Sequence, residues 1–174
     1  MRPTPILAIV TALAVLGAVG VAAQQNEHMG MPLDTRQPLD FPAHMRKHML
    51  MNMRSHLEAL GEILASLGEG DGVKAGKIAQ DRLGLESPAA AACLKPGASV
   101  ESARASPMSD MAAMMAEHMP PHMREMGFAM HESASAFAAE AAKMPQGGDP
   151  KPALKALAQV TQNCAGCHSA YRLR

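Results

Sequence analysis

The C-terminal stretch KPALKALAQVTQNCAGCHSAYRLR, residues 151–174, decides the expected fold of this chain. Asp149 can cap a helix at this point, and Pro150 suits the first helical turn. Beyond them, residues that recur at intervals of three and four predict one inward-facing side of the helix. These residues are Leu154, Leu157, Thr161, Cys164, His168 and Tyr171. The pattern predicts an amphipathic C-terminal helix whose inner side carries a cysteine and a histidine about one turn apart.

The composition of the chain also favours helices. Aromatic residues make up 2% of the sequence and tryptophan is absent, so alanine, leucine and the 16 methionines must fill the core. These three residue types favour helix, whereas the β-branched and aromatic residues typical of sheets are scarce after the first 23 residues. The predicted fold class is therefore all-α.

Three further helices with one apolar side each precede the C-terminal one. Periodicity predicts them at residues 43–67, 72–83 and 121–144, with a long loop at 85–107 and a short methionine-rich helix at 109–117. Mostly short connections and one-sided stripes make an antiparallel four-helix bundle the economical arrangement, with the C-terminal helix as its last member. The inward side predicted for the first helix comprises Met45, Met49, Met53, His56 or Leu57, Leu60, Leu64 and Leu67.

The N-terminus has the order of a secretory signal peptide. Arg2 precedes an apolar run from Ile6 to Val21, and small residues follow before Gln24. We therefore expect residues 1–23 to be a cleaved signal, residues 24–40 a flexible lead-in and residues 41–174 the helical bundle. A retained membrane anchor is the alternative, but the run is short for a span of about 20 apolar residues. An exported, periplasmic protein without a stable membrane anchor is expected.

Charge and motif content exclude several function classes. Sixteen basic and sixteen acidic residues balance, and the absence of a polybasic stretch argues against a nucleic-acid partner. The sequence also lacks a Ser/His/Asp constellation, a glycine-rich phosphate loop and a clustered carboxylate pair. Enzymatic activity is therefore not expected.

The sequence CAGCH at residues 164–168 matches the attachment pattern of a c-type haem, C-x-x-C-H. Residues three apart on a helix lie about 4.5 Å apart along its axis, so Cys164 and Cys167 can reach the two vinyl groups on one edge of a porphyrin. His168 then lies where its imidazole can bind the iron. The motif predicts one covalent haem c, held by both thiols and by an axial histidine.

Other interpretations of the cysteine pair fit less well. A structural disulfide would suit an exported protein, and thioredoxin-like proteins also use C-x-x-C. However, no βαβ pattern surrounds this motif, and no second C-x-x-C completes a zinc site. Cys93 lacks an obvious partner once the other two cysteines are used, so it is interpreted as an incidental loop residue.

The string CAGCHSAYR at residues 164–172 resembles the C-terminus of the class II cytochromes c, meaning cytochrome c prime and its low-spin relatives. Arg46 and His56 in the first helix add to the resemblance, which covers about residues 41–174. The resemblance implies a four-helix bundle with the haem on its last helix. Tyr171 and Arg172 would pack at the haem edge. Arg46 would meet a haem propionate or remain a solvated charge.

The resemblance implies that a residue about four positions after Arg46 faces the distal side of the iron. That position is Leu50, and an apolar residue there gives five-coordinate haem that binds NO or CO, whereas methionine gives six-coordinate haem suited to electron transfer. Periodicity points Met49 and Met53 inward and Met51 elsewhere, so Met53, with Met49 as the alternative, is the expected second axial ligand. All of these methionines can equally be core residues.

Two residues of the helix predicted at 121–144, Met130 and His131, lie on or beside its inward stripe. Met130 lies on the predicted inward stripe and is expected to line the pocket, whereas His131 lies beside the stripe and is not expected to bind the iron. Electron transfer to and from a redox protein partner is the favoured function. Some members of the family pair through their first two helices, which leaves a homodimer open.

A copper-binding protein is the competing class. Soft thioethers and imidazoles bind Cu(I), and His-Met doublets recur along the chain. The strongest candidates are two pairs of doublets, at residues 44–49 and 118–123; the histidines concerned are His44, His48, His118 and His122, and a further doublet is His28-Met29.

Overall fold

The computed structural model describes residues 33–99, 101 and 109–174. The predicted signal peptide, most of the predicted lead-in and one end of the predicted 85–107 loop lie outside these residues. The chain divides into two units, Met1–Asp34 and Thr35–Arg174, and every described helix belongs to the second. None of the described helices is both long and apolar enough to cross a membrane.

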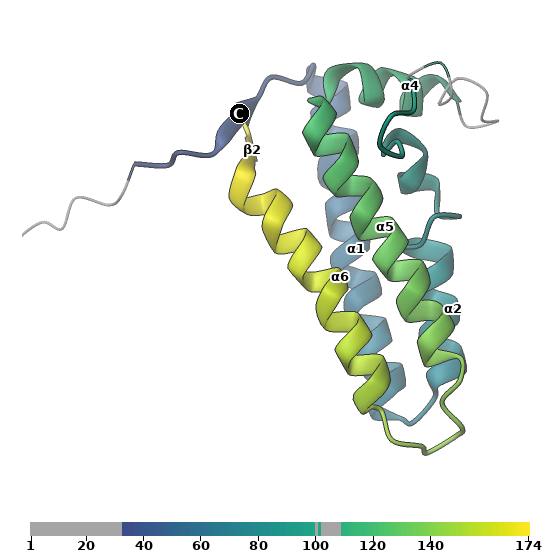
Figure 1. The fold of residues 1–174 in the computed structure, drawn as a ribbon. Helices are drawn as coiled ribbons and strands as arrows, with labels where there is room; N and C mark the ends of the chain where they lie inside the picture. Colours follow the sequence, from purple (N-terminus) through teal and green to yellow (C-terminus); the bar gives the residue numbers. More distant parts are fainter. Residues whose placement is uncertain (1–32, 100, 102–108) are drawn as a thin grey trace, which may run out of the picture. The chain divides into compact units, whose positions relative to one another are not determined.

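The described residues are mostly helical, which confirms the all-α class (Figure 1). Their α-helices are α1 (Ala43–Gly68), α2 (Gly72–Arg82), α4 (Ser109–His118), α5 (Pro121–Ala141) and α6 (Lys151–Ala170). A short 3-10 helix, η1 (Pro88–Ala92), follows α2. The structure therefore places helices where the apolar periodicity predicted them.

Local sequence signals set several helix boundaries. The Asp71 side chain caps α2 by accepting a hydrogen bond of 2.8 Å from the Lys74 backbone N–H. Just before it, Gly70 has a φ of 75°, a left-handed conformation that glycine adopts without steric cost. Pro121 occupies the first turn of α5, where its missing N–H costs nothing.

The helices of Thr35–Arg174 pack in the order α1 on α2, α2 on α5 and α5 on α6 (Figure 1). Small residues allow close approach between α2 and α5: a Cβ atom on Gly76 would lie 2.7 Å from the Ala138 carbonyl oxygen. The buried residues here form a group that we call the alanine-rich cluster. It consists of Ala59, Ile63, Leu67, Ala75, Ala79, Leu83, Met130, Ala134, Phe137, Ala138, Ala141, Met144, Ala153, Leu157 and Val160.

A second buried group, the methionine-rich cluster, combines residues of α1, α4 and α5, and of the segment that joins α4 to α5, with residues of the two short strands and of the segment after the first. Its members are Leu39, Phe41, Met45, Met49, Met115, Met119, Met123 and Tyr171. Methionine is flexible and fills irregular spaces, which suits a region with few aromatic side chains.

The predicted inward side of α1 is confirmed at Leu67, which is buried, but is wrong at two other positions in the second half of the helix. Leu57 and Leu64 are 71% and 53% exposed, whereas Ala59 and Ile63 are fully buried. An α-helix has 3.6 residues per turn, so a stripe extrapolated at wider spacing drifts away from the buried face. The same correction applies to α6, where Leu154 is exposed and Ala153 is buried.

Two short strands were not predicted. β1 (Gln37–Leu39) lies within the segment expected to be a flexible lead-in, and it pairs in parallel with β2 (Tyr171–Leu173). Tyr171 was expected on the last helix, but its backbone is extended and Leu39 pairs with Leu173. The backbone hydrogen bonds of this ladder and the burial of Leu39 explain why both segments are ordered.

Candidate functional site

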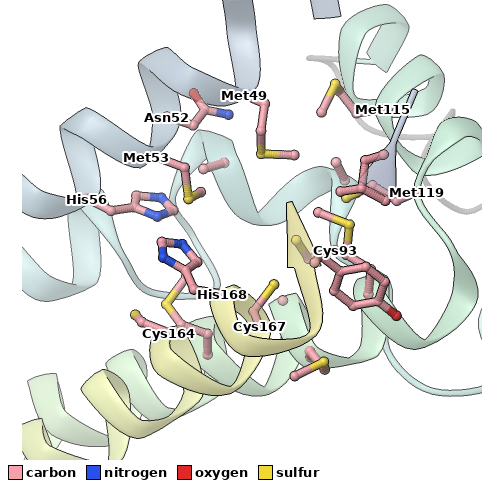
Figure 2. A pocket seen from close by; sticks show the side chains of 18 of the residues that line it. Met49, Asn52, Met53, His56, Cys93, Met115, Met119, Cys164, Cys167 and His168 are labelled. Carbon is pink, nitrogen blue, oxygen red and sulfur yellow. The ribbon is translucent and has the colours of Figure 1, made fainter. Parts of the chain in front are cut away.

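A cavity of about 540 Å³ lies among α1, η1, α4, α5, α6 and β2. Its volume is within the range of roughly 300–1,000 Å³ typical of pockets for small molecules and cofactors. Its wall is mainly apolar and unusually rich in sulfur (Figure 2). The methionines that line it are Met49, Met53, Met111, Met115, Met119, Met123, Met126 and Met130.

The three residues of the predicted attachment motif line this cavity together. Cys164 and Cys167 are partly buried free thiols on successive turns of α6. His168 is exposed to solvent but also contributes to the lining, so it lies where the cavity meets the surface. Figure 2 shows its ring pointing from α6 towards the side chains of α1.

The protonation state of the two thiols separates the competing interpretations. Burial raises the pKa of both Cys164 and Cys167 above the ordinary thiol value. They also lie near the C-terminus of α6, where the helix dipole disfavours a thiolate. A thioredoxin-like pair needs the opposite, a lowered pKa at a helix N-terminus. The surroundings therefore do not suit a reactive disulfide-exchange pair.

The α1 wall faces the motif with several side chains that could bind a metal. Met49 is buried and Met53 is half-buried, and both line the cavity, whereas Met51 is 56% exposed and does not. This distinction follows the predicted periodicity of α1. Leu50, which the family resemblance places over the iron, lines the cavity but is 40% exposed.

Two buried histidines lie in contact, which the sequence did not predict. His56 of α1 and His131 of α5 are 7% and 1% exposed, and both line the cavity. Their rings meet edge to face with centroids 5.7 Å apart. The sequence predicted that His131 lies beside the inward stripe of α5. The buried face of α5 is wider than that stripe and includes both Met130 and His131.

Both histidines are held in the neutral form. Burial, followed by the charges of His131 and Arg82, lowers the pKa of His56 from 6.5 to about 4. Burial also lowers the pKa of His131, although its hydrogen bond to the Leu83 carbonyl opposes this effect. His131 Nδ1 lies 2.6 Å from that carbonyl oxygen, and because a carbonyl only accepts, the Nδ1–H donates.

Cys93 is not an incidental loop residue. It follows η1 directly and lines the cavity, and burial followed by the nearby Cys167 raises its pKa to about 12. Gly127 of α5 leaves room for it, since a Cβ atom at that position would collide with the Cys93 sulfur. A neutral, packed thiol is the result.

The structure does not bring Arg46 to the cavity. Its guanidinium donates a hydrogen bond of 2.6 Å to the Arg174 carbonyl oxygen instead. Arg36 and Arg172 line the cavity, because the β1–β2 ladder brings the segment around Arg36 next to the C-terminus. Arg36 also donates to the His168 carbonyl oxygen at 3.4 Å. Tyr171 lines the cavity as well, from β2 rather than from the helix.

In three of the His-Met doublets the histidine is exposed and the methionine is buried. His44, His118 and His122 are exposed, whereas the methionines that follow them, Met45, Met119 and Met123, are buried. Among the described residues, no three His, Cys, Asp or Glu side chains come together as a metal site. The doublet His28-Met29 lies outside the described residues.

Comparison with protein-family models, with curated proteins and with solved structures found no match to this chain. The function therefore has to be argued from the geometry of the cavity.

Proposed function

We propose that this protein is an exported, periplasmic c-type cytochrome that carries one covalent haem and transfers electrons to and from a redox protein partner. The observation that carries the proposal is the convergence of Cys164, Cys167 and His168 on one wall of an apolar cavity large enough for a cofactor. The same motif on a buried, fully packed helix face would have argued for a structural role.

The haem would supply a one-electron Fe(III)/Fe(II) couple. Cys164 and Cys167 would hold it through two thioether bonds. In forming each bond the thiol adds across a vinyl group: a C–S bond forms, the thiol proton passes to the neighbouring carbon, and no electrons are lost. The attachment therefore needs reduced thiols, as found here. His168 would be the first axial ligand.

The cavity wall fits such a group in three respects. Thioether and aliphatic side chains give the porphyrin faces an apolar environment, which the methionines provide. Arg36 and Arg172 offer positive charge for the propionates. Met53 and Met49 of α1 also line the cavity, and either thioether would offer the iron a second ligand from the protein.

Electron transfer is favoured over gas binding for a specific reason. A five-coordinate, gas-binding haem needs an open distal face lined by an apolar residue such as Leu50. Leu50 is 40% exposed, whereas other residues of α1 that line the cavity, Met49 and Met53, carry potential ligand atoms. A six-coordinate iron near the protein surface suits transfer to a transient partner. Arranging α1, α2, α5 and α6 as an antiparallel four-helix bundle with a haem-carrying last helix belongs to the same proposal.

The decisive experiment is expression together with a haem-ligation system, followed by denaturing gel electrophoresis with haem staining and intact mass measurement. We expect one haem that stays attached after denaturation. Replacing both motif cysteines, Cys164→Ser with Cys167→Ser, should abolish the attachment completely. Cys93→Ser is the matched control and should retain it, because that thiol lies outside the C-x-x-C-H motif. A colourless wild-type protein would refute the proposal.

A further inference from the structure

The nitrogen Nε2 of His56 is buried and has no hydrogen-bond partner among the described residues. A buried polar atom without a partner costs roughly 1–3 kcal/mol, so such atoms are uncommon in native proteins. Each one calls for a physical explanation, such as a ligand that the atom binds. The thioethers of Met53 and Met49 carry no comparable penalty, because they are satisfied by apolar contacts. His56 is therefore the α1 side chain that gains most from a ligand in the cavity.

The position of His56 matches that need. Its side chain lines the same cavity as His168, and the two residues come from α1 and α6. Figure 2 shows the two imidazoles facing each other across the space in which Met53 also lies. Two imidazoles presented from separate helices form the ligand pair that a six-coordinate haem iron can use.

His131 acts as a positioning residue behind His56. Because its Nδ1–H donates to the Leu83 carbonyl oxygen at 2.6 Å, its ring orientation is fixed. Its ring packs against His56 at an interplanar angle of 84°. The contact limits how the His56 ring can turn. A preset ring loses less conformational freedom when it binds a ligand.

We infer that His56, rather than Met53 or Met49, is the second axial ligand of the iron, bound through Nε2. This inference rests on the proposed function and deepens it by naming the ligand set of the same site. The neutral imidazole binds without releasing a proton, and its lone pair satisfies the atom that the protein leaves without a partner. A bis-histidine iron would have a lower reduction potential than a His/Met iron, since thioether ligation raises the potential.

Spectroscopy of the wild-type holoprotein gives the first test. We expect a low-spin ferric iron whose electron paramagnetic resonance and near-infrared magnetic circular dichroism are those of two imidazole ligands. A thioether-to-iron charge-transfer band, or a high-spin five-coordinate iron, would overturn the inference while leaving the proposed cytochrome function intact. Absence of covalent haem would instead refute the proposed function itself.

Variants give the second test. His56→Ala should lose the low-spin spectrum and bind CO rapidly when reduced, and added imidazole should restore the low-spin spectrum. Met53→Leu and Met49→Leu remove the competing thioether ligands at similar volume, and each should keep a low-spin iron that does not bind CO rapidly. If either of these opened the iron to CO while His56→Ala did not, the methionine would be the ligand. Rescue by imidazole separates ligation from a merely structural role of His56.

Discussion

In the alanine-rich cluster, helices approach one another through alanine and glycine, whereas in the methionine-rich cluster long thioether side chains border a cavity of about 540 Å³. Gly76 lies almost against the backbone of Ala138, but Met115 and Met123 border open space. One chain thus uses its smallest residues where helices pack tightly and its most adaptable ones where they border the cavity. The two clusters should respond differently to mutation, pH and added volume.

The largest expected difference concerns truncation of a large side chain in each cluster. Phe137 is fully buried in the alanine-rich cluster, so Phe137→Ala should cost about 3–5 kcal/mol of unfolding free energy through the void it leaves. Met123 already borders the cavity, and Met123→Ala should cost no more than about 2 kcal/mol because it only enlarges existing space.

Urea denaturation in the haem-free Cys164→Ser/Cys167→Ser background provides the measurement. Using that background for both variants removes any contribution of bound haem from the comparison. Equal costs for the two truncations would mean that the two clusters are packed equally well, and the contrast drawn here would fail.

The second expected effect is sensitivity to acid at the cavity, which His56 lines. Above pH 6.5, His56 is neutral in both the folded and the unfolded chain and has no effect on stability. Burial, with the charges of His131 and Arg82, lowers its pKa in the folded protein from 6.5 to about 4, so between these values only the unfolded chain takes up the proton. The free energy of unfolding should therefore fall by about 3 kcal/mol as the pH drops from 6.5 to 4.

Denaturation curves at several pH values in the same haem-free background would measure this loss. His56→Gln should flatten the dependence, whereas His122→Gln, at an exposed position on α5, should preserve it. A pH dependence that survives unchanged in His56→Gln would show that other groups cause it.

The inward face of α5 was predictable from sequence, but those of α1 and α6 were predictable only in part. On α5 Met130 is both apolar and buried, so periodicity found it. On α1 and α6 the buried residues include Ala59 and Ala153, whereas hydrophobicity alone favoured nearby leucines that are exposed. Close packing rewards small size, which a hydrophobic pattern does not register.

The motif residues of the site were predictable, but most of its surroundings were not. Local spacing predicted that Cys164, Cys167 and His168 would lie near one another. The pairing of β1 with β2 joins residues more than 130 positions apart in the sequence. No local pattern could therefore predict that Arg36 lines the cavity and that Arg46 does not. The contact between His56 and His131 likewise depends on how α1 and α5 pack.

The smallest expected effects come from two glycine-to-alanine substitutions, which should change the unfolding free energy in opposite directions. Gly76→Ala adds a Cβ atom 2.7 Å from the Ala138 carbonyl oxygen, and rigid backbone cannot easily yield, so we expect a loss of about 1–3 kcal/mol in unfolding free energy. Gly61→Ala, inside α1, meets nothing within 4 Å and should stabilise by roughly 0.5–1 kcal/mol, because alanine favours helix over glycine. Urea midpoints of the two variants would compare them directly. If both substitutions stabilised the protein, α2 and α5 could separate at little cost, and close packing in the alanine-rich cluster would not be what holds these helices together.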